Sequence, residues 1–245
     1  VSIKALPTAT ISGTTTICSG TGATITFNGT ANATVTYNIN GGANQTVVLN
    51  GSGVATVATG NLASNTTYNL VSISGTGSPL CSKILTGLAT VTVTPLPTAT
   101  ISGTTTICSG TSTSIVFSGT PNATVTYTIN GGSNHTVVLD GTGNASVSTG
   151  ILSSNAVYNL VSIATAGIPV CSKAITGTVT ITVKSLPVAG ISGTTSICSG
   201  TASTINFSGT PNATITYTVN GGSNQTVVLN GSGAATVSTG ILSSN

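Results

Sequence analysis

The chain has 245 residues with four Lys, one acidic residue and one His, so only 2% of it is charged and its net charge is +3. Nucleic-acid binding needs clustered Lys and Arg, and a general acid/base pair or catalytic triad needs titratable groups, so this composition argues against both. We therefore expect no catalysis, no cofactor, no metal site and no nucleic-acid partner. No run of 18 apolar residues occurs, which predicts no membrane insertion.

The sequence repeats with a period of 90 residues (96 − 6 and 186 − 96). The string LPTATISGTTTICSG begins at Leu6 and again at Leu96, and a close variant begins at Leu186. Residues 96–155 and 186–245 are identical at 46 of 60 positions. A repeat of this length indicates a whole domain copied in tandem. We assign residues 1–5 to the last strand of a preceding repeat, 6–95 to repeat 1, 96–185 to repeat 2 and 186–245 to an incomplete repeat 3.

Alternating apolar and polar residues between turn-forming Gly, Pro and Asn predict short strands, and no segment has the apolar stripe of a helix. In repeat 2 the predicted strands, in chain order, are Ala99–Ser102, Thr113–Ser118, Ala123–Asn130, His135–Asp140, Ala145–Ile151, Tyr158–Ala164 and Thr176–Val183. This pattern predicts an all-β fold of tandem immunoglobulin-like or fibronectin-III-like β-sandwiches, with about seven strands per 90-residue repeat.

A Leu stands six positions before a Tyr near the start of a predicted strand in two repeats, as Leu62 with Tyr68 and Leu152 with Tyr158. The spacing is typical of the tyrosine corner of Greek-key sandwiches, in which the phenol hydroxyl bonds to the backbone across a corner between strands. We predict this structural role for the two pairs.

Cysteines occupy fixed places in the repeat. Cys18, Cys108 and Cys198 stand in ICSG, whereas Cys81 and Cys171 stand in CSK. Two cysteines per complete repeat, without a CxxC motif, predict one disulfide per repeat and an extracellular location. We favour bonds within repeats, Cys18–Cys81 and Cys108–Cys171, with the partner of Cys198 outside the chain.

A second cysteine pairing stays open. If successive strands pair as simple hairpins, ICSG and CSK fall at opposite ends of one repeat. The CSK of one repeat then lies near the ICSG of the repeat before it, which predicts a Cys18–Cys171 bond between neighbours. A bend of the first strand back toward its starting end would restore the bond within the repeat.

Several strings together carry a family resemblance. PTATISGTTTICSG, followed by NATVTYTINGG, TVVL, ATVSTG, TYNLVSI, a Cys before the last strand and the linker VTVTPLPTATISG, resembles the tandem Ig-like repeats of giant cell-surface adhesins of Bacteroidota, including the gliding-motility adhesins. The resemblance covers the whole chain. It implies type IX secretion and a role in cell adhesion, gliding motility or surface filaments.

Two functions follow as expectations. The first is the structural stalk or filament of a large extracellular adhesin at the cell surface, with neighbouring repeats as partners, lateral self-association, and a surface or glycan ligand at an unseen tip. The alternative is a multivalent array of carbohydrate-binding modules. The absence of Trp, with only three Phe and five Tyr, tells against this alternative because sugar sites usually display aromatic rings.

Overall fold

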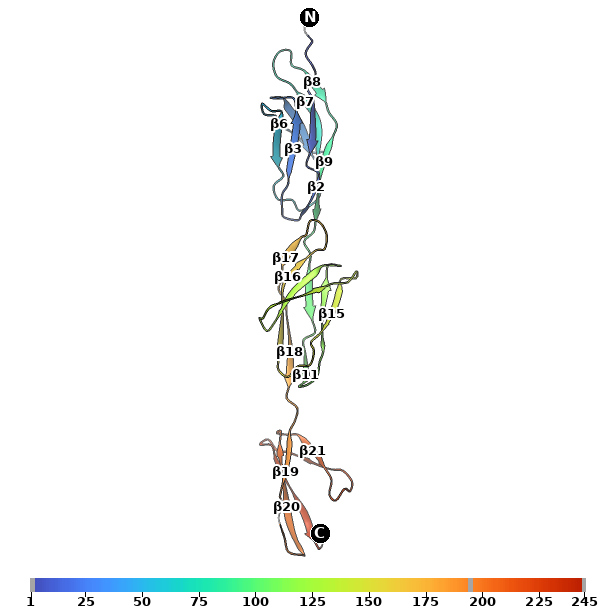
Figure 1. Ribbon diagram of the computed structural model, residues 1–245, viewed down its shortest axis with the longest axis vertical. Helices are drawn as coiled ribbons and strands as arrows, with labels where there is room; N and C mark the ends of the chain where they lie inside the picture. Colours follow the sequence, from blue (N-terminus) through green and yellow to red (C-terminus); the bar gives the residue numbers. More distant parts are fainter. Residues whose placement is uncertain (1–2, 194–195, 244–245) are drawn as a thin grey trace. The chain divides into compact units, whose positions relative to one another are not determined.

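The computed structural model describes residues 3–193 and 196–243, which form β-strands and turns without a helix (Figure 1). Accordingly, these ranges contain no helix that could span a membrane. Spatial contacts divide the chain into two compact units, one with repeat 1 and most of repeat 2, the other with repeat 3 and one end of repeat 2. Of the strand predicted at 1–5, residues 1 and 2 lie outside the described residues, and residues 3–5 form no strand.

Repeats 1 and 2 each have nine strands. Those of repeat 1 are β1 (Ala9–Ser12), β2 (Thr15–Cys18), β3 (Thr24–Gly29), β4 (Thr34–Ile39), β5 (Asn44–Val48), β6 (Val54–Ala58), β7 (Thr66–Ser74), β8 (Ser82–Ile84) and β9 (Leu88–Thr94). Those of repeat 2 are β10 (Ala99–Ser102), β11 (Thr105–Cys108), β12 (Ser114–Gly119), β13 (Thr124–Ile129), β14 (Asn134–Val138), β15 (Asn144–Ser148), β16 (Ala156–Ala164), β17 (Ser172–Ala174) and β18 (Thr178–Lys184). The described part of repeat 3 has β19 (Ala189–Ser192), β20 (Thr201–Gly209), β21 (Thr214–Tyr217), β22 (Gln225–Val228) and β23 (Ala234–Leu242).

Each complete repeat is a two-sheet sandwich. In repeat 1 a three-stranded sheet has the order β1-β3-β6, and a second sheet has the order β2-β9-β7-β4-β5 with β8 paired to β7. Repeat 2 repeats both orders with β10-β12-β15 and β11-β18-β16-β13-β14, with β17 on β16. The described part of repeat 3 has the sheet β19-β20-β23 and the hairpin β21-β22. The prediction of tandem immunoglobulin-like β-sandwiches is confirmed.

The predicted strand count was too low by two. The strands that the alternation missed are β11 and β17 in repeat 2, with their counterparts β2 and β8 in repeat 1. Each has only three or four residues, and β2 pairs in parallel with β9, which lies more than 70 positions later in the chain. A short strand that depends on so distant a partner leaves little local pattern.

Gly13 divides the first strand between the two sheets. Before it, β1 pairs antiparallel with β3, and after it, β2 pairs parallel with β9. Gly13 has φ +118°, and a Cβ there would lie 2.6 Å from the carbonyl oxygen of Thr24, so only glycine fits without strain. Because the chain changes sheet but keeps its direction, β2 carries Cys18 on to the end of the repeat where β9 also ends.

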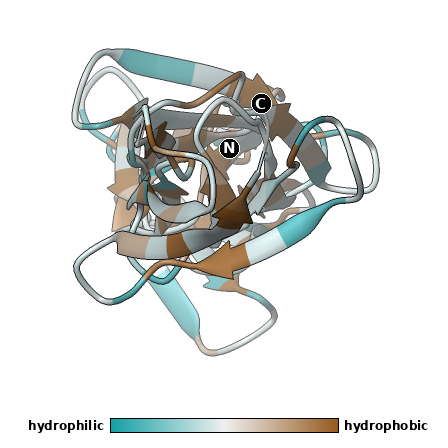
Figure 2. Cartoon of the chain, turned by 90° about the horizontal axis from the view of Figure 1, so that it is seen from below, coloured by the Kyte–Doolittle hydropathy of each residue, from teal (hydrophilic) through white to brown (hydrophobic). Residues whose placement is uncertain are grey.

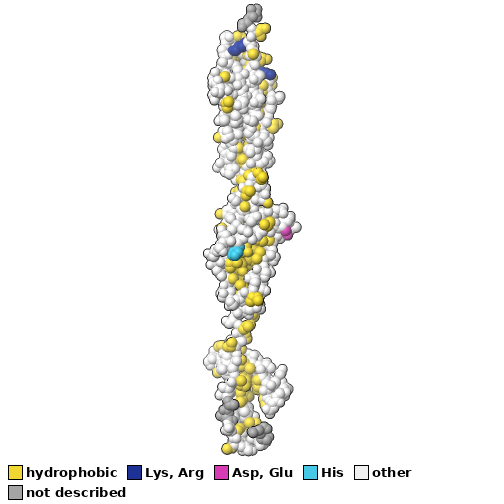
Figure 3. All heavy atoms as spheres, in the orientation of Figure 1, with side chains coloured by type: hydrophobic (Ala, Val, Ile, Leu, Met, Phe, Trp, Pro, Cys, Tyr) yellow, Lys and Arg dark blue, Asp and Glu magenta, His cyan; other side chains and the backbone are white. Residues whose placement is uncertain are grey.

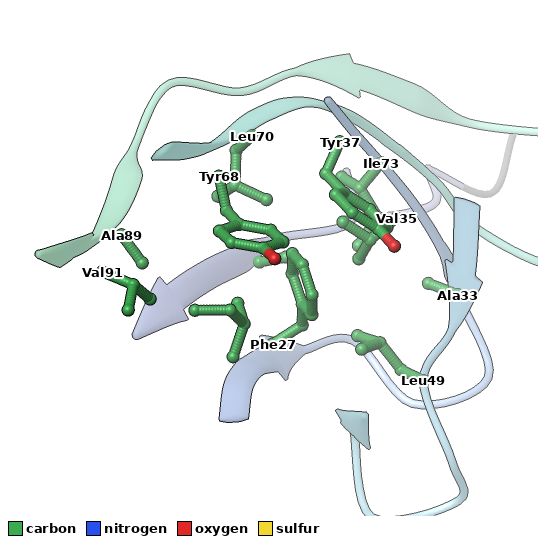
Figure 4. Close-up of a cluster of buried hydrophobic side chains, with 12 residues drawn as sticks. Phe27, Ala33, Val35, Tyr37, Leu49, Tyr68, Leu70, Ile73, Ala89 and Val91 are labelled. Atoms are coloured by element: carbon green, nitrogen blue, oxygen red, sulfur yellow. The ribbon is translucent and has the colours of Figure 1, made fainter. Parts of the chain in front are cut away.

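Inward-facing side chains from both sheets form the core of repeat 1 (Figure 4). Phe27 from β3 lies 5.0 Å from Tyr37 of β4 between ring centroids, and Tyr37 lies 6.5 Å from Tyr68 of β7. Repeat 2 reproduces the first of these distances, since Phe117 and Tyr127 are also 5.0 Å apart. Figure 2 shows the alternation behind this packing, because single strands carry both brown and pale segments while teal gathers near the hairpins.

The structure lends the tyrosine-corner prediction no support. Tyr68 and Tyr158 are each 2% exposed, and neither hydroxyl makes a hydrogen bond within the described residues. Burial raises the pKa of both phenols. The rings are core residues because Thr66, Tyr68 and Leu70 alternate along β7 and all point inward.

Candidate functional site: a disulfide between repeats

The ICSG half of the site is fixed by the backbone of its own repeat. Cys18 ends β2 opposite Thr94, the last residue of β9, and the Ser19 N–H donates to the Thr94 carbonyl at 2.9 Å. The following turn is held by Leu62, whose carbonyl accepts from Gly20 N–H at 2.8 Å. Cys18 therefore lies at the exit end of repeat 1, where β9 leads into the Pro-containing linker. Leu62, and Leu152 in repeat 2, have this backbone role in place of the predicted corner.

The CSK half lies at the opposite end of its repeat. In repeat 2, Ala164 at the end of β16 pairs with Ser172 at the start of β17. The Thr165 N–H donates to the Cys171 carbonyl at 2.9 Å, and the Cys171 N–H donates to the Thr165 hydroxyl at the same distance. Residues 173–176 also share a small hollow with residues 98–99, which begin repeat 2. Cys171 thus lies where the chain enters repeat 2 from repeat 1.

Cys18 and Cys171 form a disulfide bond across 153 sequence positions, with their Cα atoms 5.5 Å apart. The favoured pairs Cys18–Cys81 and Cys108–Cys171 are therefore wrong, and the bond between neighbouring repeats is the one formed. The physical reason is the direction of β2, which continues away from the entry end instead of bending back. The two cysteines of one sandwich are left at its opposite ends.

The other cysteines are free thiols in this structure. Cys81 is partly exposed, while Cys108 and Cys198 are exposed. That the partner of Cys198 lies outside the chain stays a prediction.

Two other titratable side chains, those of Asp140 and His135, contact neighbouring residues of repeat 2. Asp140 is exposed, and its Oδ1 accepts from Thr142 N–H at 2.8 Å, Thr142 Oγ1 at 2.7 Å and Asn144 N–H at 2.9 Å. The Thr142 hydroxyl, followed by the backbone N–H groups, holds the pKa of this carboxyl below its ordinary value. The ring of His135 stacks on Tyr127 with centroids 5.5 Å apart. Among the described residues, no three His, Cys, Asp or Glu side chains gather as metal ligands would.

Charged side chains are correspondingly sparse on the surface. Figure 3 shows isolated dark-blue, magenta and cyan patches on a face that is otherwise white and yellow. A hollow of about 660 Å³ lies in repeat 3 and is lined by residues that include Phe207, Tyr217 and Val237. The second sheet of repeat 2 contains β16 and β18, which have no counterparts in the described part of repeat 3. The hollow is therefore an uncovered core rather than a ligand pocket.

No family model and no curated protein matches this chain. Among solved structures, a segment of three immunoglobulin domains of titin has a TM-score of 0.53 and 14% identity, with 99% of this chain and 90% of that chain covered. A marsupial T cell receptor has a TM-score of 0.48 and 13% identity, with 86% of this chain and 84% of that chain covered. At such identities the likeness to titin shows the tandem immunoglobulin-like fold alone.

Proposed function

We propose that this chain is a load-bearing structural segment of the stalk or filament of a large extracellular bacterial adhesin, with no catalytic role of its own. The observation that carries the proposal is the covalent bond between consecutive repeats, Cys18–Cys171. Disulfides persist in oxidising surroundings outside the cytosol. A bond that joins domains while leaving each core intact serves a spacer better than a binding site.

The strand pairing supports a mechanical role. When the Cys18–Cys171 bond is reduced, tension along the chain enters repeat 1 ahead of β1 and leaves after β9, whereas in the oxidised chain the covalent path passes from Cys18 to Cys171. Because β2 and β9 are parallel, from Thr15 opposite Val91 to Cys18 opposite Thr94, opposed pulling loads their hydrogen bonds along the strands and all together. Breaking the hydrogen bonds of a strand pair together requires more force than breaking them one at a time.

The sequence-based alternative, a carbohydrate-binding array, has less support. Phe27, Tyr37 and Tyr68 are buried in the core of repeat 1, so they offer no aromatic platform to a sugar. Binding of the 245-residue chain to a glycan array would favour the alternative over the stalk.

Lateral association is a second part of the proposal. β5 and β14 are edge strands, and each exposes a valine, Val48 and Val138, at 62%. Exposed edges of this kind can pair with another chain when little charge opposes contact. Sedimentation at rising concentration should show reversible association, and a monomer throughout would leave a simple spacer.

Single-molecule pulling on the 245-residue chain tests the load-bearing role. The Cys18–Cys171 bond encloses 153 residue steps, so the oxidised chain should release roughly 500 Å less contour length than the Cys171→Ser chain. Cys108→Ser is the matched control, because Cys108 is a free cysteine in the same ICSG string, and it should keep the short contour. Equal contour lengths for the oxidised and Cys171→Ser chains would overturn the load-bearing role.

The cellular location needs its own test. An antibody against the chain should label intact cells of the source organism. Labelling that appears only after lysis would overturn the adhesin assignment.

A further inference from the structure

The turn that follows the ICSG cysteine has the same hydrogen bonds in all three repeats. In each, the hydroxyl of the Thr three positions after the cysteine donates to the cysteine carbonyl at 2.7 Å, from Thr21, Thr111 and Thr201. In each, the glycine two positions after the cysteine donates its N–H to a leucine carbonyl at 2.8–2.9 Å, on Leu62, Leu152 and Leu242. Cys108 and Cys198 are thus held in the same turn as Cys18.

The CSK half-site is likewise duplicated. The Gly75 N–H donates to the Cys81 carbonyl at 2.8 Å, as Thr165 does to Cys171 at 2.9 Å. The short strands that follow also match, since Ser74 pairs with Ser82 as Ala164 pairs with Ser172. Cys81 therefore occupies the position that Cys171 has when it is bonded.

Of the bonded pair, Cys18 is partly exposed, as the free Cys81 is. Cys171 is fully buried, whereas Cys108 is exposed. The chain thus contains an unbonded copy of each half-site in addition to the bonded pair Cys18–Cys171.

We propose that the Cys18–Cys171 bond is one member of a series with the 90-residue period, in which the ICSG cysteine of each repeat bonds to the CSK cysteine of the next. Cys108 takes a CSK-type cysteine 153 positions after it, and Cys81 takes an ICSG-type cysteine 153 positions before it, both at the observed separation. The inference rests on the proposed role as part of a longer array. Each bond forms when two thiols pass two electrons and two protons to an oxidant of the disulfide class, which leaves as two thiols.

The series would give the array a short covalent path. From Cys171 only 27 residues (198 − 171) lead to Cys198, where the next bond crosses to a later repeat. Two repeats contain 180 residues, so full unfolding would lengthen the path by roughly 90 Å of chain instead of about 600 Å. Tension would then be borne by bonds and a few strands.

A CSK-type thiol could come from the following repeat of the same chain or from a second copy, whose Cys81 is free. To separate these sources, the chain is extended after Asn245 by a copy of residues 156–185, which supplies counterparts of β16, β17 and β18 and a copy of Cys171. The extended protein is oxidised with glutathione disulfide, digested and mapped by mass spectrometry. The control carries Ser in place of the added cysteine.

The expected result is a monomer in which Cys108 is joined to the added cysteine while Cys81 and Cys198 remain thiols, and in the control Cys108 also remains a thiol. Joining of the added cysteine to Cys198, or a free Cys108, would overturn the series. A dimer linked through Cys81 would assign the half-site to a second copy and would also overturn it.

A variant of the unextended chain covers the case in which the added strands fail to fold. In Cys18→Ser the series requires Cys108 and Cys171 to remain thiols, and a bond between these two would overturn it. The same digest reports on Cys18–Cys171 in the extended protein. Absence of that bond would overturn the proposed function, whereas its presence beside a free Cys108 would overturn the series alone.

Discussion

Cys18 and Cys171 lie in different repeats, yet their Cα atoms are 5.5 Å apart because one stands at the exit end of its sandwich and the other at the entry end of the next. Neither sandwich needs this bond to enclose its own core, since the core residues of repeat 1 come from residues 9–91 alone. The bond therefore acts on the junction and on the unfolded chain.

Removing the Cys18–Cys171 bond should destabilise repeats 1 and 2 together. In the chain-entropy model a closed loop of 153 residues contributes about 5 kcal/mol, so Cys171→Ser should lower the guanidinium unfolding midpoint by a corresponding amount. Cys81→Ser, which replaces a free cysteine in the same CSK string, should leave the midpoint unchanged. Equal midpoints for the two variants would contradict the pairing, and a thiol titration of the native oxidised chain should find three free cysteines.

The tyrosine hydroxyls should differ in importance according to their partners. The Tyr37 hydroxyl donates to Gln45 Oε1 at 3.0 Å, so Tyr37→Phe should cost roughly 1 kcal/mol. Tyr68→Phe should be nearly neutral because its hydroxyl makes no hydrogen bond in the described structure and is not among buried oxygens that lack a partner. Thermal unfolding measures both, and a loss at Tyr68 as large as at Tyr37 would revive the tyrosine corner.

Gly13→Ala should disturb both the sandwich and the disulfide. The added methyl would lie 2.6 Å from the Thr24 carbonyl oxygen at φ +118°, so we expect more than about 1 kcal/mol of destabilisation and slower oxidation of Cys18. Gly51→Ala is the control, because nothing lies within 4 Å of its added Cβ and its φ is not in the left-handed region. If Cys18 were oxidised at the wild-type rate in Gly13→Ala, the change of sheet at Gly13 would not control the position of Cys18.

Asp140→Asn should alter stability only in acid. The lowered pKa of Asp140 means that its contribution is present above the unfolded pKa of about 3.9 and is lost as pH falls through the folded value. Near neutral pH the variant should unfold like the parent, because Asn50 accepts the equivalent N–H bonds from Ser52 and Val54 in repeat 1. Melting curves below pH 4 should show the parent losing more stability than the variant, and parallel curves would show that the carboxylate is not coupled to folding.

The fold was largely predictable because β-branched alternation and turn residues report on local structure. Ala99–Ser102 was predicted with the bounds that β10 has. The strands β2 and β11 were missed because their partners, β9 and β18, are distant in the chain, and the same omission hid the route by which ICSG reaches the exit end. The inward direction of Tyr68 could have been inferred from its parity with Thr66 and Leu70 along one strand.

The disulfide pairing was less accessible from the sequence. Spacing shows that two cysteines recur per repeat, but it does not show which ends of the sandwiches meet. Both pairings satisfied the sequence, and the change of sheet at Gly13 decides between them.

The same bond also sets an order of events during biogenesis. A bond from Cys18 to Cys81 could close after 63 further residues (81 − 18), as soon as one repeat had emerged. Cys18 can instead form its bond only after the CSK segment of the following repeat, with Cys171 placed 153 positions later, has been made and has folded. If chains emerge amino-terminus first, the ICSG cysteine of each repeat can be oxidised only after the next repeat has emerged, and the most recently emerged repeat has a free ICSG thiol. The number of disulfide bonds formed then reports how many repeats of the chain have emerged.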